Sequence, residues 1–190
     1  MPPEKGIMLI LKSASPRRKQ ALESLGLTFS VRPSSVSEEF LQGERPLDYL
    51  KRVTLDKLES PAGTDTLISC DTIVVLENRL FPKPESPEQA MEFLQALSGK
   101  EHSVFTGLAI YSPKKTVYEF DETKVLFRNW TDDERRNYVS SARPFDKAGA
   151  YGIQDVGSPA ESFEGSYWNV VGFPMRKFLL FLPIWKEFLR

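Results

Sequence analysis

The sequence predicts an α/β fold with a mixed, curved central sheet, because apolar strand segments alternate with amphipathic helix segments along its 190 residues. A chain of this length fits one domain, or two small lobes around a shared cleft. Hydrophobic residues make up 41% of the chain and charged residues 27%, which is ordinary for a globular domain. We therefore expect residues 1–190 to form a single folded domain rather than a disordered or fibrous protein.

The first half of the chain is predicted to begin with a strand and a helix. Apolar runs predict strands at residues 7–11 and 67–76, and a weak alternation of apolar and polar residues predicts a short strand at 28–32. Ser15-Pro16 has the pattern of a helix N-cap followed by proline, and Gly26 is expected to end that helix. Pro46 opens a second helix, whose apolar face is expected to contain Leu47, Leu50, Thr54 and Leu58.

The second half continues the alternation. Ser86 to Gln89 and Thr131 to Glu134 both have the capping-box pattern of a helix start. Strands are expected at 104–111, at 116–127 and near 167–173, the last of them after a loop that contains several glycines. A closing helix is expected to bury Phe178, Leu182, Trp185 and Leu189.

Composition excludes several classes of function. The net charge of −1 argues against a nucleic-acid polymer as partner, which needs a broad basic surface. The apolar run from Ile7 to Leu11 is too short for a signal peptide or a membrane span. Cys70 is the only cysteine, so we expect no intrachain disulfide and a cytoplasmic location. With His102 the only histidine, a bound metal would be held mostly by carboxylates, which favours Mg²⁺ or Mn²⁺.

A basic segment, Ser13 to Lys19, opens the first helix. Arg17 and Arg18 fall in its first turn, where the helix dipole favours carboxylates rather than cations. A bound anion resolves this conflict, because backbone N–H groups and guanidinium groups together suit phosphate oxygens. The alternative is a solvated basic turn.

Asp71 and Thr72 interrupt the apolar strand at 67–76. A charge buried in a core strand destabilises the folded protein by roughly several kcal/mol unless it is paired or binds a metal. Asp71 therefore marks either a strand end that opens into a cleft or a structural, hydrogen-bonded aspartate, and we favour the cleft because α/β sheets place sites at strand ends. Glu38 and Glu39 follow a predicted strand and could complete a metal site, or they are solvated loop acids.

Two further segments carry polar groups in restrained backbones. Lys83 stands between Pro82 and Pro84, which stiffen the chain around it, although a solvated lysine is the usual outcome. The loop from Asp146 to Gln154 contains small residues that permit close approach of a ligand, and Gln154 offers both a donor and an acceptor for a base edge. The sequence lacks a Walker phosphate loop and a dinucleotide-binding glycine motif.

Taken in order, these segments resemble the Maf family of septum-formation inhibitor proteins over nearly the whole chain. The matching segments are Ser13-Ala14-Ser15-Pro16-Arg17-Arg18, Asp71-Thr72-Ile73-Val74, Lys83-Pro84, Leu97-Ser98-Gly99, Thr106-Gly107, Asp146-Lys147-Ala148-Gly149-Ala150-Tyr151-Gly152-Ile153-Gln154 and Asn169-Val170-Val171-Gly172-Phe173-Pro174. The nine-residue segment ending at Gln154 is specific by itself.

The resemblance implies two lobes around a deep cleft, a curved mixed sheet and often a homodimer. It implies a nucleoside triphosphate pyrophosphatase with Asp71 as the catalytic aspartate. Arg17, Thr72 and Gln154 match the subgroup that acts on dTTP and UTP, including modified uridine triphosphates, rather than on methylated guanine nucleotides. Substrate-binding residues would be Ser13, Arg17, Arg18, Lys57, Thr72, Lys83 and Gln154, and a metal would be held by Glu38, Glu39 and Asp71.

Three positions depart from the family pattern: Lys12 and Cys70 replace smaller residues, and the segment from Ser60 to Thr66 is short. None removes a matched chemical group. The mechanism we expect is attack on the α-phosphorus by a metal-associated water that Asp71 orients or deprotonates. The competing hypotheses are a nucleotide-binding regulator of cell division without significant turnover, and an interaction module that docks through its C-terminal aromatic side chains.

Overall fold

The computed structural model describes residues 6–59 and 63–190. Residues 60–62, part of the short segment noted between Ser60 and Thr66, lie outside the described residues. Backbone contacts divide the described chain into two compact units. The first unit is drawn from Met1–Asp71, Thr106–Asp121 and Gly172–Arg190, and the second from Thr72–Phe105 and Glu122–Val171. The expectation of one domain over residues 1–190 stays a prediction.

The strands of the described residues form a mixed, seven-stranded sheet in the order β2-β1-β3-β5-β6-β7, with β4 paired to β3. Their bounds are β1 Leu9–Leu11, β2 Ser30–Val31, β3 Thr66–Leu76, β4 Arg79–Phe81, β5 Glu101–Ser112, β6 Lys115–Phe127 and β7 Ala160–Glu164. β1 is parallel to β2 and β3, whereas β4 and β7 run antiparallel to their partners. The α/β class and the mixed sheet are confirmed. The sheet is not strongly curled, and the deep cleft stays a prediction.

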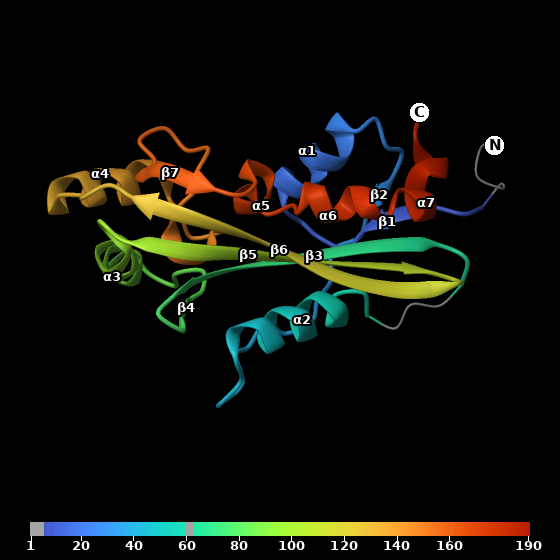
Figure 1. Ribbon diagram of the computed structural model, residues 1–190, viewed down its shortest axis with the longest axis horizontal. Helices are drawn as coiled ribbons and strands as arrows, with labels where there is room; N and C mark the ends of the chain where they lie inside the picture. The colour runs from blue at the N-terminus through green and yellow to red at the C-terminus, as the bar shows by residue number, and fades with distance from the viewer. Residues whose placement is uncertain (1–5, 60–62) are drawn as a thin grey trace. The chain divides into compact units, whose positions relative to one another are not determined.

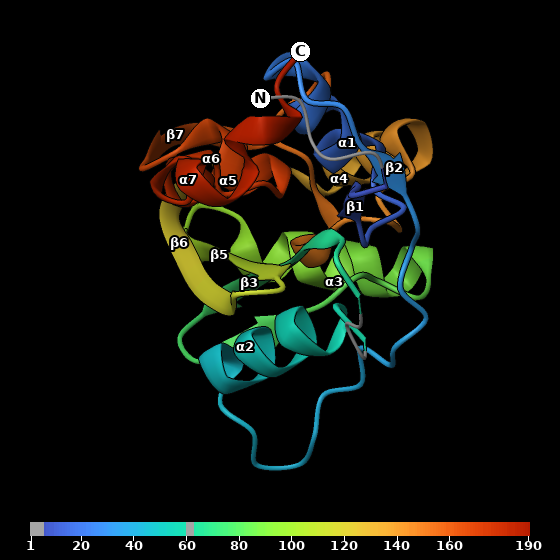
Figure 2. The same ribbon diagram turned by 90° about the vertical axis from the view of Figure 1, so that its right-hand side faces the viewer.

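In the first unit, helices cover both faces of the strands (Figures 1 and 2). These helices are α1 Pro16–Ser24, α2 Pro46–Asp56, α6 Met175–Leu180, α7 Leu182–Trp185 and the 3₁₀ turn η2 Lys186–Phe188. α2 lies on one face, and α1, α6 and α7 lie on the other. Apolar side chains of both layers are buried, including Leu11, Leu22, Leu50, Ile68 and Phe178. β3 is therefore a central strand with covered faces.

Helix α2 begins at the proline that the sequence predicted, but its buried face is rotated from the expected one. Leu50 and Thr54 are buried as expected, together with Tyr49 and Val53, whereas Leu47 is 41% exposed. The prediction for Leu47 was wrong because apolar character alone did not reveal that Tyr49 supplies the more favourable buried surface. Gly107 of β5 permits the close approach of α2, since a Cβ there would lie 2.4 Å from the Thr54 hydroxyl oxygen.

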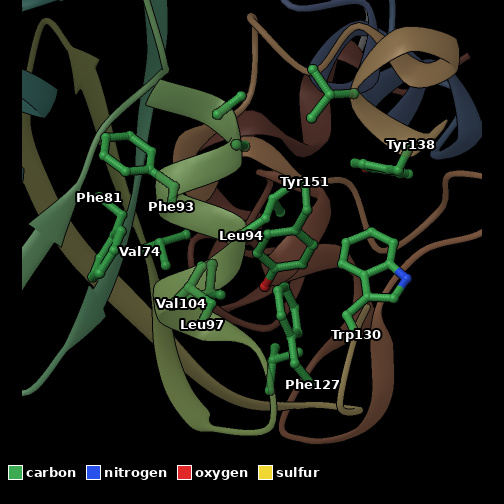
Figure 3. Packing of buried hydrophobic residues seen from close by; sticks show 14 residues of the cluster. Val74, Phe81, Phe93, Leu94, Leu97, Val104, Phe127, Trp130, Tyr138 and Tyr151 are labelled. Carbon is green, nitrogen blue, oxygen red and sulfur yellow. The ribbon is translucent and has the colours of Figure 1, made fainter. Parts of the chain in front are cut away.

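The second unit is built around an aromatic core. Its helical segments are α3 Pro87–Leu97, α4 Asp132–Ala142, η1 Ala148–Ala150 and α5 Tyr167–Val171. Ser86 accepts a hydrogen bond from the Gln89 N–H at the start of α3, and Thr131 and Glu134 form the predicted capping box of α4. Figure 3 shows Tyr151 packed among Leu94, Phe127 and Trp130. These contacts join α3, β6 and the glycine-containing loop in one core.

Two elements near the C-terminus differ from the sequence prediction. Residues 167–171 form helix α5 rather than a strand, because Ser166 accepts from the N–H of Asn169 and the buried Asn169 amide donates to the Val104 carbonyl at 3.0 Å. The nearby strand is β7. The closing helix is broken into α6, α7 and η2, since Pro183 cannot donate a helical hydrogen bond. Phe178 and Trp185 are buried and stacked at 4.4 Å, but Leu182 and Leu189 are exposed.

Candidate active site

Asp71 is the last residue of β3 in the first unit, and its carboxylate is buried. Its Oδ1 lies 2.5 Å from the Nζ of Lys57, which follows α2 and is equally buried. The Ser69 hydroxyl donates to the Thr54 carbonyl at 2.6 Å, which ties β3 to α2 close to this pair. The fold thus buries an ion pair beside a sheet whose faces are covered by helices. Either charge without its partner would destabilise the protein there.

Glu38 joins this pair from the loop between β2 and α2. Its Oε1 lies 2.7 Å from Lys57 Nζ, so a single ammonium group contacts two carboxylates. The Tyr49 hydroxyl donates to the Glu38 carbonyl at 2.9 Å and fixes the backbone at this point. Glu38, predicted as a metal ligand, therefore lies next to Asp71.

Glu39 is exposed and is held only through its backbone in the described structure. Arg52 Nη2 donates to the Glu39 carbonyl at 3.0 Å, and the same guanidinium group binds both carboxylate oxygens of Glu44 at 2.7 Å. This contact lowers the pKa of Glu44. Arg52 thus anchors the loop that carries Glu38, and the loop geometry favours Glu38 over Glu39 as the second carboxylate.

The two carboxylates at Lys57 are chemically suited to Mg²⁺ or Mn²⁺. Because both contact one nitrogen, their nearest oxygens are at most about 5 Å apart. An octahedral Mg²⁺ ion holds its ligand oxygens no more than about 4 Å apart, so binding of one ion by both carboxylates would bring these oxygens within that shorter distance. Among the described residues, no group of at least three His, Cys, Asp or Glu side chains is placed to hold a metal ion. The residues therefore fit an ion that is bound by one or two carboxylates together with water and substrate phosphates. This kind of coordination is usual for Mg²⁺.

The basic turn at α1 has the features of an anion site. The Ser13 oxygen accepts hydrogen bonds from the Ser15 N–H at 3.2 Å and from Arg18 Nη1 at 3.1 Å, which leaves the Ser13 O–H group as a donor. Arg18 Nε also donates to the Gly172 carbonyl at 2.9 Å. The Ser15 side chain makes no capping hydrogen bond, and no acidic residue occupies the first turn of α1. These groups leave the turn electropositive.

Ser13 is 8% exposed, and Arg17 and Arg18 are half-buried. The first unit thus brings Ser13, Arg17 and Arg18 together at one turn, as predicted. Lys12, one of the departures from the family pattern, pairs with Glu59, and this contact lowers the pKa of Glu59. The extra positive charge is therefore neutralised locally.

The charge of Asp71 acts on neighbouring tyrosines. Burial, followed by the charges of Asp71 and Glu119, raises the pKa of Tyr118 to about 12. Burial and the charges of Asp71 and Glu38 raise the pKa of Tyr49 further above its usual value. Both hydroxyls therefore remain protonated at neutral pH. Burial also raises the pKa of the Cys70 thiol to about 11, so this cysteine is a packed and unreactive side chain.

The other predicted substrate-binding residues belong to the second unit. Thr72 follows Asp71 in β3 and is half-buried, whereas Lys83 and Gln154 are exposed. Lys83 lies after β4, and Gln154 lies in the turn after η1, where its Nε2 donates to Asp155 Oδ1 at 3.2 Å.

Sequence reasoning missed four residues that support these groups: Tyr49, Arg52, Tyr138 and Asp155. Tyr49 and Arg52 are three residues apart on α2. Tyr49 could have been recognised, because a buried aromatic residue with a hydroxyl group usually has a hydrogen-bond partner. Asp155 directly follows the matched segment that ends at Gln154. No local pattern connected it with Tyr138.

Comparison with known proteins places this geometry in a family. The model of the family described as Maf-like protein matches residues 8–183. The chain belongs to the Maf family. A Maf relative from Leptospira interrogans serogroup Icterohaemorrhagiae serovar Lai, named dTTP/UTP pyrophosphatase, is 48% identical over 96% of this chain and 98% of its own length.

Two further Maf relatives carry the same name. The protein from Bacillus cereus (strain ATCC 14579) is 40% identical over 89% of this chain and 91% of its own length. The protein from Geobacter sp. (strain M21) is 41% identical over 90% of this chain and 92% of its own length. The resemblance inferred from the motifs is confirmed. Among the described residues, every helix is too short or too polar to span a membrane.

Proposed function

We propose that this Maf protein is a nucleoside triphosphate pyrophosphatase that hydrolyses dTTP and UTP to the monophosphate and pyrophosphate. The observation that carries the proposal is the buried Asp71 carboxylate, which shares the Lys57 ammonium group with Glu38. Near-full-length relatives that bear the name dTTP/UTP pyrophosphatase support it.

In the proposed reaction, one water molecule attacks the α-phosphorus. The bond between the α-phosphorus and the oxygen that bridges to the β-phosphorus breaks, and pyrophosphate leaves with that oxygen. Asp71 orients the water and accepts its proton at a carboxylate oxygen. Lys57 contacts the carboxylates of both Asp71 and Glu38, so its ammonium group holds the Asp71 side chain in position.

Asp71 and Glu38 are the residues that would hold Mg²⁺ or Mn²⁺. When bound, the ion supplies positive charge to the phosphate oxygens and activation of water. At the α1 turn, Ser13, Arg17 and Arg18 bind phosphate oxygens and stabilise the charge that develops on the leaving pyrophosphate. In the second unit, Thr72, Lys83 and Gln154 are the residues that the Maf pattern assigns to the substrate, with Gln154 reading the base.

A cytoplasmic location is supported by the nucleotide substrates and by Cys70 being the only cysteine of the sequence. It stays a prediction, as does the homodimer that the family pattern implies.

The experiment that tests the proposal follows the oxygen of water. The protein is incubated with UTP or dTTP and Mg²⁺ or Mn²⁺ in ¹⁸O-labelled water, and the products are separated. We expect monophosphate that carries the label, together with unlabelled pyrophosphate. Diphosphate with orthophosphate would indicate attack at the γ-phosphorus, and labelled pyrophosphate would indicate attack at the β-phosphorus. Either result, or tight binding with no product, would contradict the proposal.

Base selectivity has a separate test. The ratio of kcat/KM for UTP over that for 7-methyl-GTP is measured for the wild type, for Gln154→Ala and for the combined replacement of Arg17, Thr72 and Gln154. Gln154→Ala should weaken UTP turnover by roughly 1–3 kcal/mol of transition-state binding, because polar groups of the base lose their partner. A ratio that no variant changes would mean that other residues read the base.

A further inference from the structure

Asp155, next to the base-reading candidate Gln154, lies in a hydrogen-bond network within the second unit. Its Oδ1 accepts a hydrogen bond from Gln154 Nε2 at 3.2 Å, and its Oδ2 accepts one from the Tyr138 hydroxyl at 2.6 Å. Lys147 Nζ lies 3.7 Å from the same Oδ2. An ionised carboxylate only accepts hydrogen bonds. The chemistry of Asp155 therefore decides which end of the Gln154 amide faces it: the NH₂ end.

Tyr138 holds Asp155 in place from helix α4. Its ring is buried against Trp130, with ring centroids 5.2 Å apart (Figure 3), and its hydroxyl oxygen accepts from the Gly152 N–H at 2.9 Å. Burial and the hydrogen bond to Asp155 raise the pKa of Tyr138 far above its usual value. The hydroxyl therefore stays protonated and keeps donating to Asp155 over the working range of pH.

Gly152 provides the space in which Gln154 and Asp155 meet. A Cβ at this position would lie 2.6 Å from Gln154 Nε2 and 2.8 Å from both carboxylate oxygens of Asp155. Because a real Cβ does not approach so closely, any larger residue would displace the two side chains. The turn itself is closed by the Asp155 N–H, which donates to the Gly152 carbonyl at 3.1 Å. Backbone and side chains thus favour one arrangement of the Gln154 amide.

We propose that Asp155, anchored by Tyr138, is a positioning residue that fixes the Gln154 amide and thereby selects uracil and thymine over cytosine. With Nε2 turned towards Asp155, the exposed amide offers its Oε1 acceptor and its remaining N–H donor. Uracil and thymine present an N3–H donor between two carbonyl acceptors, which matches this pattern. Cytosine held in the same position presents an N3 acceptor and an amino donor where uracil presents N3–H and a carbonyl, so pairing with it needs the amide turned by 180°.

The inference rests on the proposed function, because it assumes that Gln154 contacts the base of the substrate. A freely turning glutamine could pair with either pyrimidine by exchanging its two ends. The contribution of Asp155 is to make the exchanged orientation unfavourable, since it would place Oε1 against a carboxylate oxygen. The specificity therefore comes from a residue that does not itself need to touch the substrate.

The test is the ratio of kcat/KM for UTP over that for CTP, measured by pyrophosphate release. Asp155→Asn keeps the size of the side chain but can donate to Oε1, so the turned amide is no longer opposed. Tyr138→Phe removes the anchor of Asp155 by a different route. We expect the ratio to fall by about 10-fold in Asp155→Asn, the scale of one hydrogen bond of about 1.4 kcal/mol, and to fall less in Tyr138→Phe.

Two controls separate positioning from a general structural effect. Asp146→Asn removes a carboxylate of the same loop that also contacts Lys147, at 3.0 Å, and should change the ratio by less than about twofold. In a Gln154→Ala background, Asp155→Asn should have no further effect on the ratio, because the amide that Asp155 positions is absent. Circular dichroism of each variant reports whether it is folded.

An unchanged ratio in both Asp155→Asn and Tyr138→Phe, with UTP still cleaved, would overturn the inference and leave the proposed function intact. The inference would also be overturned if Asp155→Asn changed the ratio equally in the wild type and in the Gln154→Ala background. Failure of the wild type to release pyrophosphate from UTP would overturn both proposals together.

Discussion

Two buried polar pairs, one in each compact unit, differ in charge. In the first unit, the ionic side chains of Lys57 and Asp71 are both less than 10% exposed and form a salt bridge. In the second unit, the buried His102 ring bonds to the Tyr151 hydroxyl at 2.8 Å. Burial lowers the pKa of His102 to about 4 and raises that of Tyr151. Both members of this second pair are therefore neutral at pH 7.

Under the proposed function, the difference separates a functional polar pair from a structural one. Burying an ion pair often brings no net stability, because the loss of hydration offsets the attraction. A neutral hydrogen bond between buried side chains contributes roughly 1 kcal/mol and needs no charge. The charged pair of the first unit is thus better explained by the chemistry of Asp71 than by stability, and the neutral pair of the second unit by packing.

Removing the ammonium group of Lys57 should have the largest effect. Lys57→Met leaves Asp71 and Glu38 without their shared partner, and we expect the free energy of unfolding to fall by about 3–5 kcal/mol, the usual result of breaking a buried pair. Millimolar Mg²⁺ or Mn²⁺ should restore part of this stability by bridging the two carboxylates. Urea unfolding with and without metal measures both effects.

The matched control is Lys51→Met, which replaces an exposed lysine of helix α2 whose ammonium group lies over the Tyr118 ring. It should change stability by less than about 0.5 kcal/mol. If metal stabilised the wild type and both variants equally, the two carboxylates would not be its binding site.

Neutralising Asp71 itself should affect turnover more than folding. Asp71→Asn keeps the shape of the side chain but cannot accept the proton of water, so we expect kcat for UTP to fall by at least ~100-fold. Lys57 keeps Glu38 as its partner, which limits the loss of stability. Asp56→Asn, at the exposed end of α2, is the control. An active Asp71→Asn protein would transfer the catalytic role to Glu38.

Part of this site could be predicted from the sequence because its signals are local. An aspartate inside an apolar strand, two arginines after Ser15-Pro16 and a capping box at Thr131 each depend on neighbouring residues alone. The structure places them in β3, at the start of α1 and at the start of α4. Nucleotide specificity, in contrast, was predicted only through the family pattern.

The remainder depends on contacts that are distant in sequence. Glu38 rather than Glu39 contacts Lys57, and Tyr49 and Arg52 hold the backbone of this loop from α2. The segment at 167–171 has the aromatic and β-branched residues of a strand, but the hydrogen bond of Asn169 to Val104 stabilises it as a helix. Such tertiary contacts override local propensity and leave no signal in a single sequence.

The neutral state of His102 should make the stability of the protein depend on pH. The pKa of about 4 in the folded chain lies below the ordinary value of 6.5, so the unfolded chain binds the proton first as pH falls. The contribution of neutral His102 to the free energy of unfolding is fully present above pH 6.5. It is lost as the pH falls from 6.5 to 4, and the loss is at most about 3 kcal/mol. His102 is the only histidine, so His102→Leu should remove this part of the pH dependence. Equal slopes of unfolding free energy against pH in both proteins would contradict it.

The smallest expected effect concerns Tyr151, the hydrogen-bond partner of His102. Tyr151→Phe removes the hydroxyl that bonds to His102 Nε2 and leaves a buried ring nitrogen without that partner, at a cost of about 1–2 kcal/mol. Replacing both groups, in Tyr151→Phe with His102→Leu, should cost less than the sum of the single changes, because no polar atom of the pair is left unpaired. Urea unfolding of the four proteins at pH 7.5 gives the coupling energy directly. If the single changes added without coupling, the pair would not be a hydrogen-bonded unit. A positive coupling would instead mean that the second unit tolerates an apolar replacement of its buried pair, whereas the first unit should lose turnover whenever Asp71 is no longer a carboxylate.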